Sequence, residues 1–172
     1  MKFKYDVLCL RMMVCDILVH PVDRRIFDRD TTKVDNVYEI PLQTVLDALP
    51  YIDYFVPSRE EAQLLTNTMD PSLMANRLMQ YGCNNVIIKL GNYGCLIKNC
   101  DMEMLLPACQ VENVVDTTGA GDDFVGDLRA LARNTTLVEA VIFAQIMASV
   151  SIQKVGATTA VHNLQQIMEL ML

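Results

Sequence analysis

The sequence is poor in the residues that usually bind transition metals. It has only two histidines, His20 and His162, and none of its six cysteines forms a Cys-x-x-Cys pair. This scarcity argues against a zinc site. Several cysteines lie instead within apolar, strand-like runs, a pattern typical of buried and reduced thiols, and we therefore expect a cytoplasmic protein.

Long apolar runs and an excess of basic residues are also absent. No apolar run is long enough for a membrane-spanning helix, and no signal peptide is visible, because the segment 7–10 is too short and Arg11 interrupts it. The net charge of −7 argues against nucleic acid or an anionic membrane as the main partner. With 172 residues, 52% of them hydrophobic and 20% charged, the chain is expected to fold around a core.

Two common nucleotide-binding motifs are missing, but residues 116–124 form another glycine-containing run, Asp-Thr-Thr-Gly-Ala-Gly-Asp-Asp-Phe. No Gly-Lys-Ser/Thr follows these glycines, so the run is not a Walker loop, and Gly-x-Gly-x-x-Gly does not occur. Alternating apolar residues at 111–115 predict a strand before the run, and 124–132 predict a helix after it. At such a turn, free backbone N–H groups and the positive end of the helix dipole can hold an anion.

Asp122 is placed at the mouth of this predicted anion site. A carboxylate beside a phosphate would be repelled unless it had a chemical role. The role that fits is to accept a proton from a hydroxyl that attacks the phosphate. The alternative is an Asp that only caps the helix, which is the better interpretation of an isolated Gly-x-Gly-Asp. The length of the whole run favours the catalytic interpretation.

The run resembles the C-terminal signature of the ribokinase-like (PfkB) carbohydrate kinases, which is close to Asp-Thr-x-Gly-Ala-Gly-Asp-x-Phe, over nine consecutive positions. The resemblance implies that Asp122 is the catalytic base. It also implies an anion hole for the transferred phosphoryl group, formed by Gly119, Ala120 and Gly121. Asp123 and Asp127 replace the small residues that are usual in the family, and they add negative charge near the expected phosphate path.

Other segments resemble the nucleotide side of the same family. Residues 84–90 predict a strand, and the Leu-Gly-x-x-Gly turn after it would by itself be only a glycine-containing hairpin. Ahead of the 116–124 run it resembles the family's nucleotide-side hairpin. A helix predicted over 138–153, with the Gly-Ala that follows, resembles the border of the adenine pocket. The resemblance thus implies a nucleotide-binding set: Lys89, where the family often has Thr, with Gly91, Gly94, Thr118 and Gly156.

Two acidic residues resemble further family positions, each with a plain structural alternative. Asp16 follows a predicted opening strand, as does the Asp that binds sugar hydroxyls, but Arg11 stands where the family has Gly, and Asp16 can equally be a turn or edge-strand residue. Glu61 matches the acidic position of an Asn-x-x-Glu motif that handles Mg²⁺ and phosphate. Ser58 replaces the Asn, and Ser58 with Glu61 is also a capping box.

The resemblance implies a ribokinase-like α/β fold with three layers, α/β/α, and a mostly parallel sheet. It covers two blocks, about 5–38 and 42–172, and an interior segment that carries most sugar contacts is missing between them. We expect one truncated domain, 1–172. Within it, 1–40 holds substrate-side strands and 41–172 is the nucleotide-binding and catalytic half. A sheet edge left uncovered by the missing segment would favour self-association.

The implied activity is transfer of the ATP γ-phosphoryl group, with Mg²⁺, to a hydroxyl of a sugar or sugar-like molecule. The alternative is a catalytically inactive, truncated relative that retains only nucleotide binding. The intact 116–124 run favours the first and the missing segment favours the second. The sequence does not identify the sugar.

Overall fold

The computed structural model describes residues 6–9, 16–19, 32–34, 37–39, 42–117, 119–128, 135–153 and 155, and in the first four stretches it describes the backbone only. The chain forms two compact units. The first, called the N-terminal unit, comprises Met1–Leu90 and Cys95–Leu105, and the second, called the C-terminal unit, comprises Gly91–Gly94 and Leu106–Leu172.

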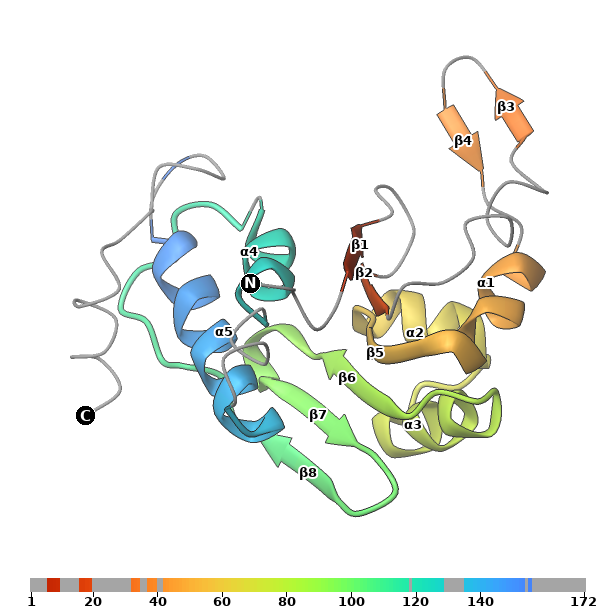
Figure 1. Cartoon of the computed structure of the whole chain (residues 1–172). Helices are drawn as coiled ribbons and strands as arrows, with labels where there is room; N and C mark the ends of the chain where they lie inside the picture. The colour runs from red at the N-terminus through yellow and green to blue at the C-terminus, as the bar shows by residue number, and fades with distance from the viewer. Residues whose placement is uncertain are drawn as a thin grey trace. The chain divides into compact units, whose positions relative to one another are not determined.

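A six-stranded sheet runs through the N-terminal unit in the order β1-β2-β5-β6-β7-β8 (Figure 1). Its strands are β1 Asp6–Cys9, β2 Asp16–Val19, β5 Ile52–Val56, β6 Asn85–Lys89, β7 Cys95–Lys98 and β8 Glu103–Leu106. A separate hairpin pairs β3, Thr32–Val34, with β4, Val37–Glu39.

The α/β class expected from the sequence is confirmed, but the expectation of a mostly parallel sheet is wrong for the pairings described. Only β5 and β6 pair in parallel, while β1–β2, β2–β5 and β6–β7 are antiparallel. Short connections account for the antiparallel pairs β1–β2 and β6–β7, whereas β2 and β5 are antiparallel although residues 20–51 separate them. A parallel pair needs a crossover of a dozen residues or more, and short links such as 90–94 between β6 and β7 allow only a hairpin.

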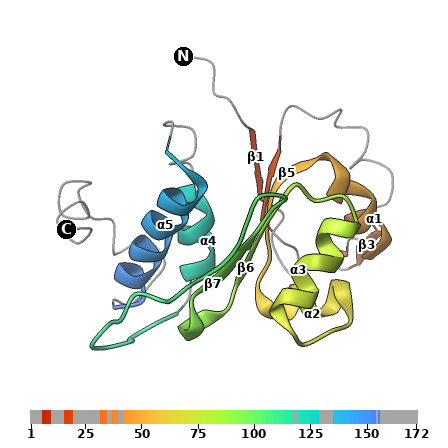
Figure 2. The ribbon, with the colours of Figure 1, turned by 90° about the horizontal axis from the view of Figure 1, so that it is seen from below.

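Three helices cover one face of this sheet (Figure 2). They are α1, Leu42–Ala48, which continues into the short 3₁₀ helix η2, Leu49–Tyr51; α2, Arg59–Thr66; and α3, Pro71–Gln80. Together α2 and α3 form the crossover between the parallel strands β5 and β6. Their ends follow local signals in the sequence, with Ser58 and Asp70 as N-caps and Gly82, at φ 104°, just past the end of α3.

The core of the N-terminal unit lies between these helices and the sheet. Phe55 of β5 and Ile88 of β6 are fully buried there with Met74 and Leu78 of α3. The three consecutive residues 86–88 of β6 are all buried, so both faces of this strand are covered. This near-continuous burial is typical of a central strand in an α/β sheet and explains why the segment reads as an unbroken apolar run.

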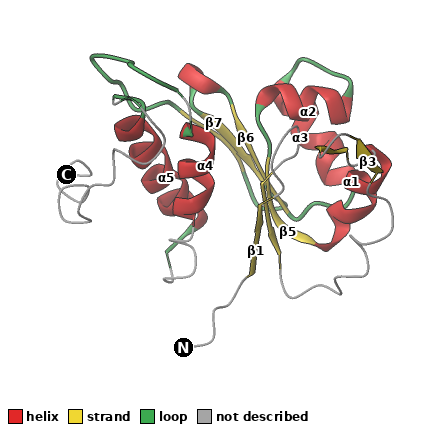
Figure 3. Cartoon of the chain, turned by 90° about the horizontal axis from the view of Figure 1, so that it is seen from above, coloured by secondary structure: helices red, strands yellow, loops and turns green. Residues whose placement is uncertain are grey.

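The C-terminal unit contains the 3₁₀ turn η3, Gly91–Tyr93, and the helices α4, Ala120–Asp127, and α5, Leu137–Ser151. The two helices pack side by side (Figure 3). The N-cap of α5 is Thr136, which forms a capping box with Glu139. Every helix in the described part of the chain is too short or too polar to span a bilayer.

Around the glycine run the predicted strand is absent, and the predicted helix is present but begins earlier than expected. Residues 111–117 form no strand; Val114 and Val115 are exposed, and the N–H groups of Val115 and Asp116 donate to the carbonyl of Ile152 at 2.8 and 3.1 Å. Their hydrogen bonds thus go to the end of α5 instead of a strand ladder. The helix predicted over 124–132 begins earlier, at residue 120, because Gly119 can take a left-handed conformation that starts it.

Candidate functional site

The site is built around the start of α4. Its N-cap, Gly119, has φ 85° and ψ −10°, a left-handed conformation that favours glycine. The first intrahelical bond runs from the N–H of Asp123 to the Gly119 carbonyl at 2.9 Å, and the N–H of Ala120 donates to Thr117 at 3.3 Å. Among the described residues, the N–H groups of Gly121 and Asp122 have no acceptor. Two backbone donors are therefore available at the positive end of the helix dipole.

The absence of a side-chain cap distinguishes α4 from the other long helices. Ser58, Asp70 and Thr136 each accept a backbone N–H at the start of α2, α3 and α5. A glycine N-cap has no side chain to do so, and the start of α4 has no such bond. The helix therefore begins with donors that an external anion, such as a phosphate group, can take up.

Three carboxylates lie on α4, and they occupy different environments. Asp122 is exposed in the first turn and makes no side-chain hydrogen bond with any described residue. Asp123, beside it, is half-buried. Asp127 is buried, with 6% of its surface exposed, at the opposite end of the helix. Of the three carboxylates, that of Asp122 is therefore accessible to a substrate hydroxyl, as a proton acceptor must be. Asp127 lies at the other end of the helix, away from the anion-binding turn.

The predicted turn glycines Gly91 and Gly94 lie together in the C-terminal unit. The N–H of Gly94 donates to the Gly91 carbonyl at 3.0 Å. Gly94 has φ 93°, and a Cβ there would lie 1.9 Å from the carbonyl oxygen of Leu106. Gly91 has φ 61°, and no atom lies within 4 Å of an added Cβ. Packing alone therefore requires glycine at position 94, whereas at position 91 there is space for a larger side chain.

Three other predicted residues meet at one edge of the sheet in the N-terminal unit. Lys89 ends β6, and its N–H donates to Pro57 at 2.8 Å, next to the bridge that pairs Ser58 with Lys89. The backbone of Asp16 pairs with Val56, the last residue of β5. Glu61 lies in the first turn of α2, which begins just after β5. The site residues thus gather outside the carboxyl ends of the parallel strands β5 and β6, where α/β sheets commonly bind ligands.

Glu61 has a structural partner, as the capping-box interpretation predicts. Its Oε2 accepts the N–H of Ser58 at 2.7 Å, and its own N–H donates to the Ser58 hydroxyl at 3.2 Å. Oε1 makes no hydrogen bond with a described residue. Groups of three or more metal-ligating side chains do not occur within the described residues. Mg²⁺ commonly takes one or two carboxylates together with substrate phosphates, so one free carboxylate oxygen fits a metal that arrives with a nucleotide.

Two residues of the predicted nucleotide-binding set, Thr118 and Gly156, lie outside the described residues. The structure also adds one contact that the sequence did not suggest. The Ile152 carbonyl anchors residues 115 and 116, directly ahead of the glycine run. No sequence pattern indicates a hydrogen bond between segments so far apart, so only the fold could identify it.

The six-stranded sheet with its crossover helices and the glycine N-cap of α4 occur in a chain whose sequence matches a known family. Residues 24–164 match the pfkB family of carbohydrate kinases, and the chain belongs to this family. It is 33% identical to a ribokinase of Schizosaccharomyces pombe over 131 residues, which cover 70% of this chain and 41% of the ribokinase.

Solved structures support the same fold. Aminoimidazole riboside kinase from Salmonella enterica, in complex with aminoimidazole riboside and an ATP analog, has a TM-score of 0.68 and 30% identity over 74% of this chain and 45% of its own. Fructokinase from Vibrio cholerae O395, with fructose, ADP and calcium ion bound, has a TM-score of 0.68 and 28% identity over 74% of this chain and 44% of its own. The chain thus spans less than half the length of these relatives.

Proposed function

We propose that this chain is an ATP-dependent carbohydrate kinase of the PfkB type, which transfers the γ-phosphoryl group to a hydroxyl of a sugar or sugar-like molecule. The observation that carries the proposal is the start of α4, where the N–H groups of Gly121 and Asp122 have no acceptor among the described residues and the Asp122 side chain is exposed. The family match and the nucleotide-bound relatives support ATP as the phosphoryl donor.

In the proposed reaction, Asp122 takes the proton of the sugar hydroxyl as its oxygen attacks the γ-phosphorus. The bond between that phosphorus and the bridging oxygen breaks, and ADP leaves. Because the N–H of Ala120 already donates to Thr117, the N–H groups of Gly121 and Asp122 stabilise the charge on the transferred group. Glu61 would hold Mg²⁺ through its free oxygen, and the metal would neutralise phosphate charge. Asp16 would bind sugar hydroxyls, and the nucleotide would contact Lys89, Gly91, Gly94, Thr118 and Gly156.

The family match runs across both compact units, which supports one ribokinase-like domain comprising the whole chain. We also place the protein in the cytoplasm. The free cysteines support this placement, because burial raises the pKa of Cys83 and of Cys95 to about 12, as in inert structural thiols. The proposed small-molecule substrate, and not nucleic acid or a membrane, is the main partner.

A second candidate is nucleotide binding without phosphoryl transfer. This candidate is favoured because the chain matches only part of its relatives; the S. pombe ribokinase, for example, is matched over 41% of its length. Catalysis of phosphoryl transfer depends mostly on the positioning of the reacting groups. An enzyme that has the catalytic base but lacks the residues that hold the acceptor hydroxyl therefore turns over slowly.

An assay of ADP formation with a panel of sugars, together with Mg-ATP calorimetry, separates the two candidates. A kinase gives sugar-dependent ADP formation that Asp122→Asn abolishes while ATP binding persists. Asp123→Asn, a change in the neighbouring half-buried carboxylate, is the matched control and leaves turnover in place. Binding without turnover supports the second candidate, and absence of both contradicts both.

A further inference from the structure

The strand β8 forms one border of the six-stranded sheet (Figure 1). Among the described residues, no strand pairs with its outer side. Its two central residues are apolar and exposed, Met104 at 40% and Leu105 at 59%. Leu96 and Ile97 in the adjacent strand β7 are buried. Because successive side chains of a strand point to opposite faces, β8 exposes apolar surface on both faces as well as an open backbone edge.

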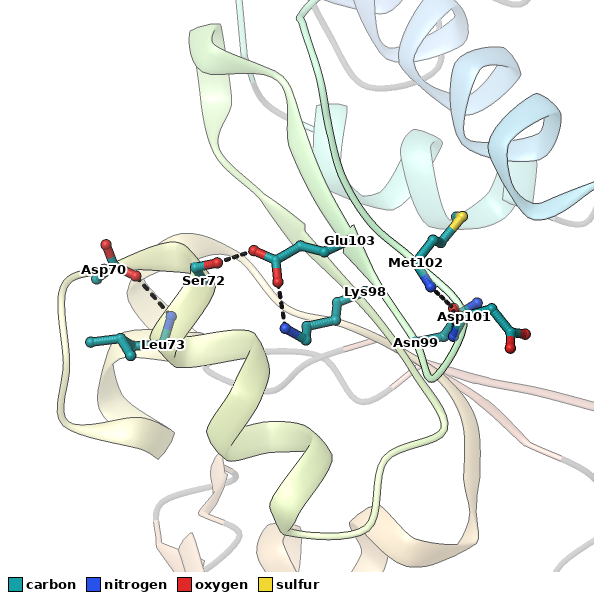
Figure 4. A network of polar contacts seen from close by, with 8 residues as sticks. All are labelled: Asp70, Ser72, Leu73, Lys98, Asn99, Asp101, Met102 and Glu103. Atoms are coloured by element: carbon teal, nitrogen blue, oxygen red, sulfur yellow. Dashed lines mark hydrogen bonds and ion pairs between the residues drawn. The ribbon is translucent and has the colours of Figure 1, made fainter.

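The only charge on β8 is already paired within the chain. Glu103 forms an ion pair with Lys98 of β7 and accepts a hydrogen bond from the hydroxyl of Ser72 in α3, as Figure 4 shows. Proteins commonly protect an edge strand by keeping it very short or with a free charge, a proline or a bulge. Of these devices β8 has only its short length of four residues, because Met104 and Leu105 are uncharged and the first proline, Pro107, comes after the strand ends.

We propose that β8 pairs with β8 of a second copy of this chain, antiparallel across a two-fold axis at Met104. The same edge presented twice is self-complementary in its backbone donors and acceptors, so a two-fold axis joins the copies without any further match in sequence. In this register Met104 of one copy lies opposite Met104 of the other and Glu103 lies opposite Leu105, so the two carboxylates do not meet.

Charge favours a second copy over a charged peptide as the occupant of this edge. Lys98 neutralises Glu103, so β8 presents no unpaired charge that would attract a basic or an acidic peptide. For the same reason, two β8 strands that pair with each other bring no like charges together. The net charge of −7 still repels two copies at long range. Added salt therefore strengthens the dimer by screening this repulsion. A four-residue strand buries far less than the roughly 1,600 Å² of a standard interface, so the dimer is weak and concentration-dependent.

Sedimentation velocity over micromolar to millimolar protein tests the proposal, with the wild-type chain, Leu105→Lys and Leu64→Lys. Leu64 lies on α2, is 56% exposed and provides a matched control, because the same substitution there leaves β8 unchanged. The expected result is a monomer–dimer equilibrium that salt strengthens, that Leu105→Lys abolishes and that Leu64→Lys retains. A wild-type monomer at millimolar concentration, or equal association of both variants, overturns the proposal.

Hydrogen exchange provides a second readout that does not depend on any variant. The backbone amides of β8 that point away from β7 gain protection as the protein concentration rises, while those of the exposed turn at Cys100 do not. Protection of these outward amides that is independent of concentration contradicts the pairing.

Discussion

Ser58 and Glu61 each satisfy a backbone N–H of the other, at 2.7 and 3.2 Å. This reciprocal pair fixes the start of α2 directly after β5, at the carboxyl edge of the parallel strands. The capping box therefore gives Glu61 a structural role without a ligand, while its second carboxylate oxygen makes no hydrogen bond with a described residue and stays available for a metal.

Substitutions at Glu61 separate the two roles. Glu61→Gln keeps the capping box, since Gln also serves at this position, but removes the charge. It should leave the melting temperature nearly unchanged and weaken the Mg²⁺ dependence of ATP binding. Glu61→Ala loses the cap as well and should lower the free energy of unfolding by about 1 kcal/mol. Calorimetry at varied Mg²⁺ and thermal melts measure both effects. If Glu61→Gln binds Mg-ATP as the wild type does, Glu61 has only its capping role.

Gly91→Ala and Gly94→Ala should differ in their effect on folding. An alanine at position 91 adopts an unfavourable left-handed conformation in open space, which costs about 1–2 kcal/mol. At position 94 the new Cβ also meets the Leu106 carbonyl at 1.9 Å, so the loss should exceed about 3 kcal/mol or prevent folding. Urea denaturation of both variants measures the difference. Equal losses would show that the segment after β8 does not pack against Gly94.

Alkaline pH should destabilise the protein through its buried thiols. Burial raises the pKa of Cys83 and of Cys95 from 9.0 to about 12, so both stay neutral in the folded chain while the unfolded thiols ionise above pH 9. Stability is therefore unaffected by these groups below pH 9 and falls between about pH 9 and 12. Each thiol contributes about 1.4 kcal/mol per pH unit at most.

The double variant Cys83→Ala/Cys95→Ala isolates this effect from other titrating groups. Its free energy of unfolding should fall less steeply than that of the wild type between pH 9 and 11, whatever its stability at neutral pH. Parallel slopes in urea titrations would contradict the assignment.

Local signals made much of the fold predictable. The capping box of Ser58 with Glu61 and the apolar strand predicted over 84–90 are encoded in neighbouring residues, and the structure has the capping box at the start of α2 and a strand at Asn85–Lys89. Strand direction and the conformation of 111–115 were predicted wrongly, because both depend on which distant segment supplies hydrogen-bond partners. The glycine run identified the candidate site, but only the structure shows that its first helical turn begins at residue 120 and leaves donors free.

The central claim is that the start of α4 binds the phosphates of ATP, and Gly121→Val tests it most directly. A side chain there would block the approach of a phosphate to the free N–H groups. Gly126→Ala is the control, since Gly126 lies in the same helix with no atom within 4 Å of an added Cβ.

Isothermal titration calorimetry with Mg-ATP is the decisive measurement. The account predicts saturable binding to the wild-type chain and to Gly126→Ala, and at least a roughly tenfold loss of affinity in Gly121→Val, about 1.4 kcal/mol. Equal affinity in all three folded proteins, or no heat with the wild type at millimolar nucleotide, would contradict it.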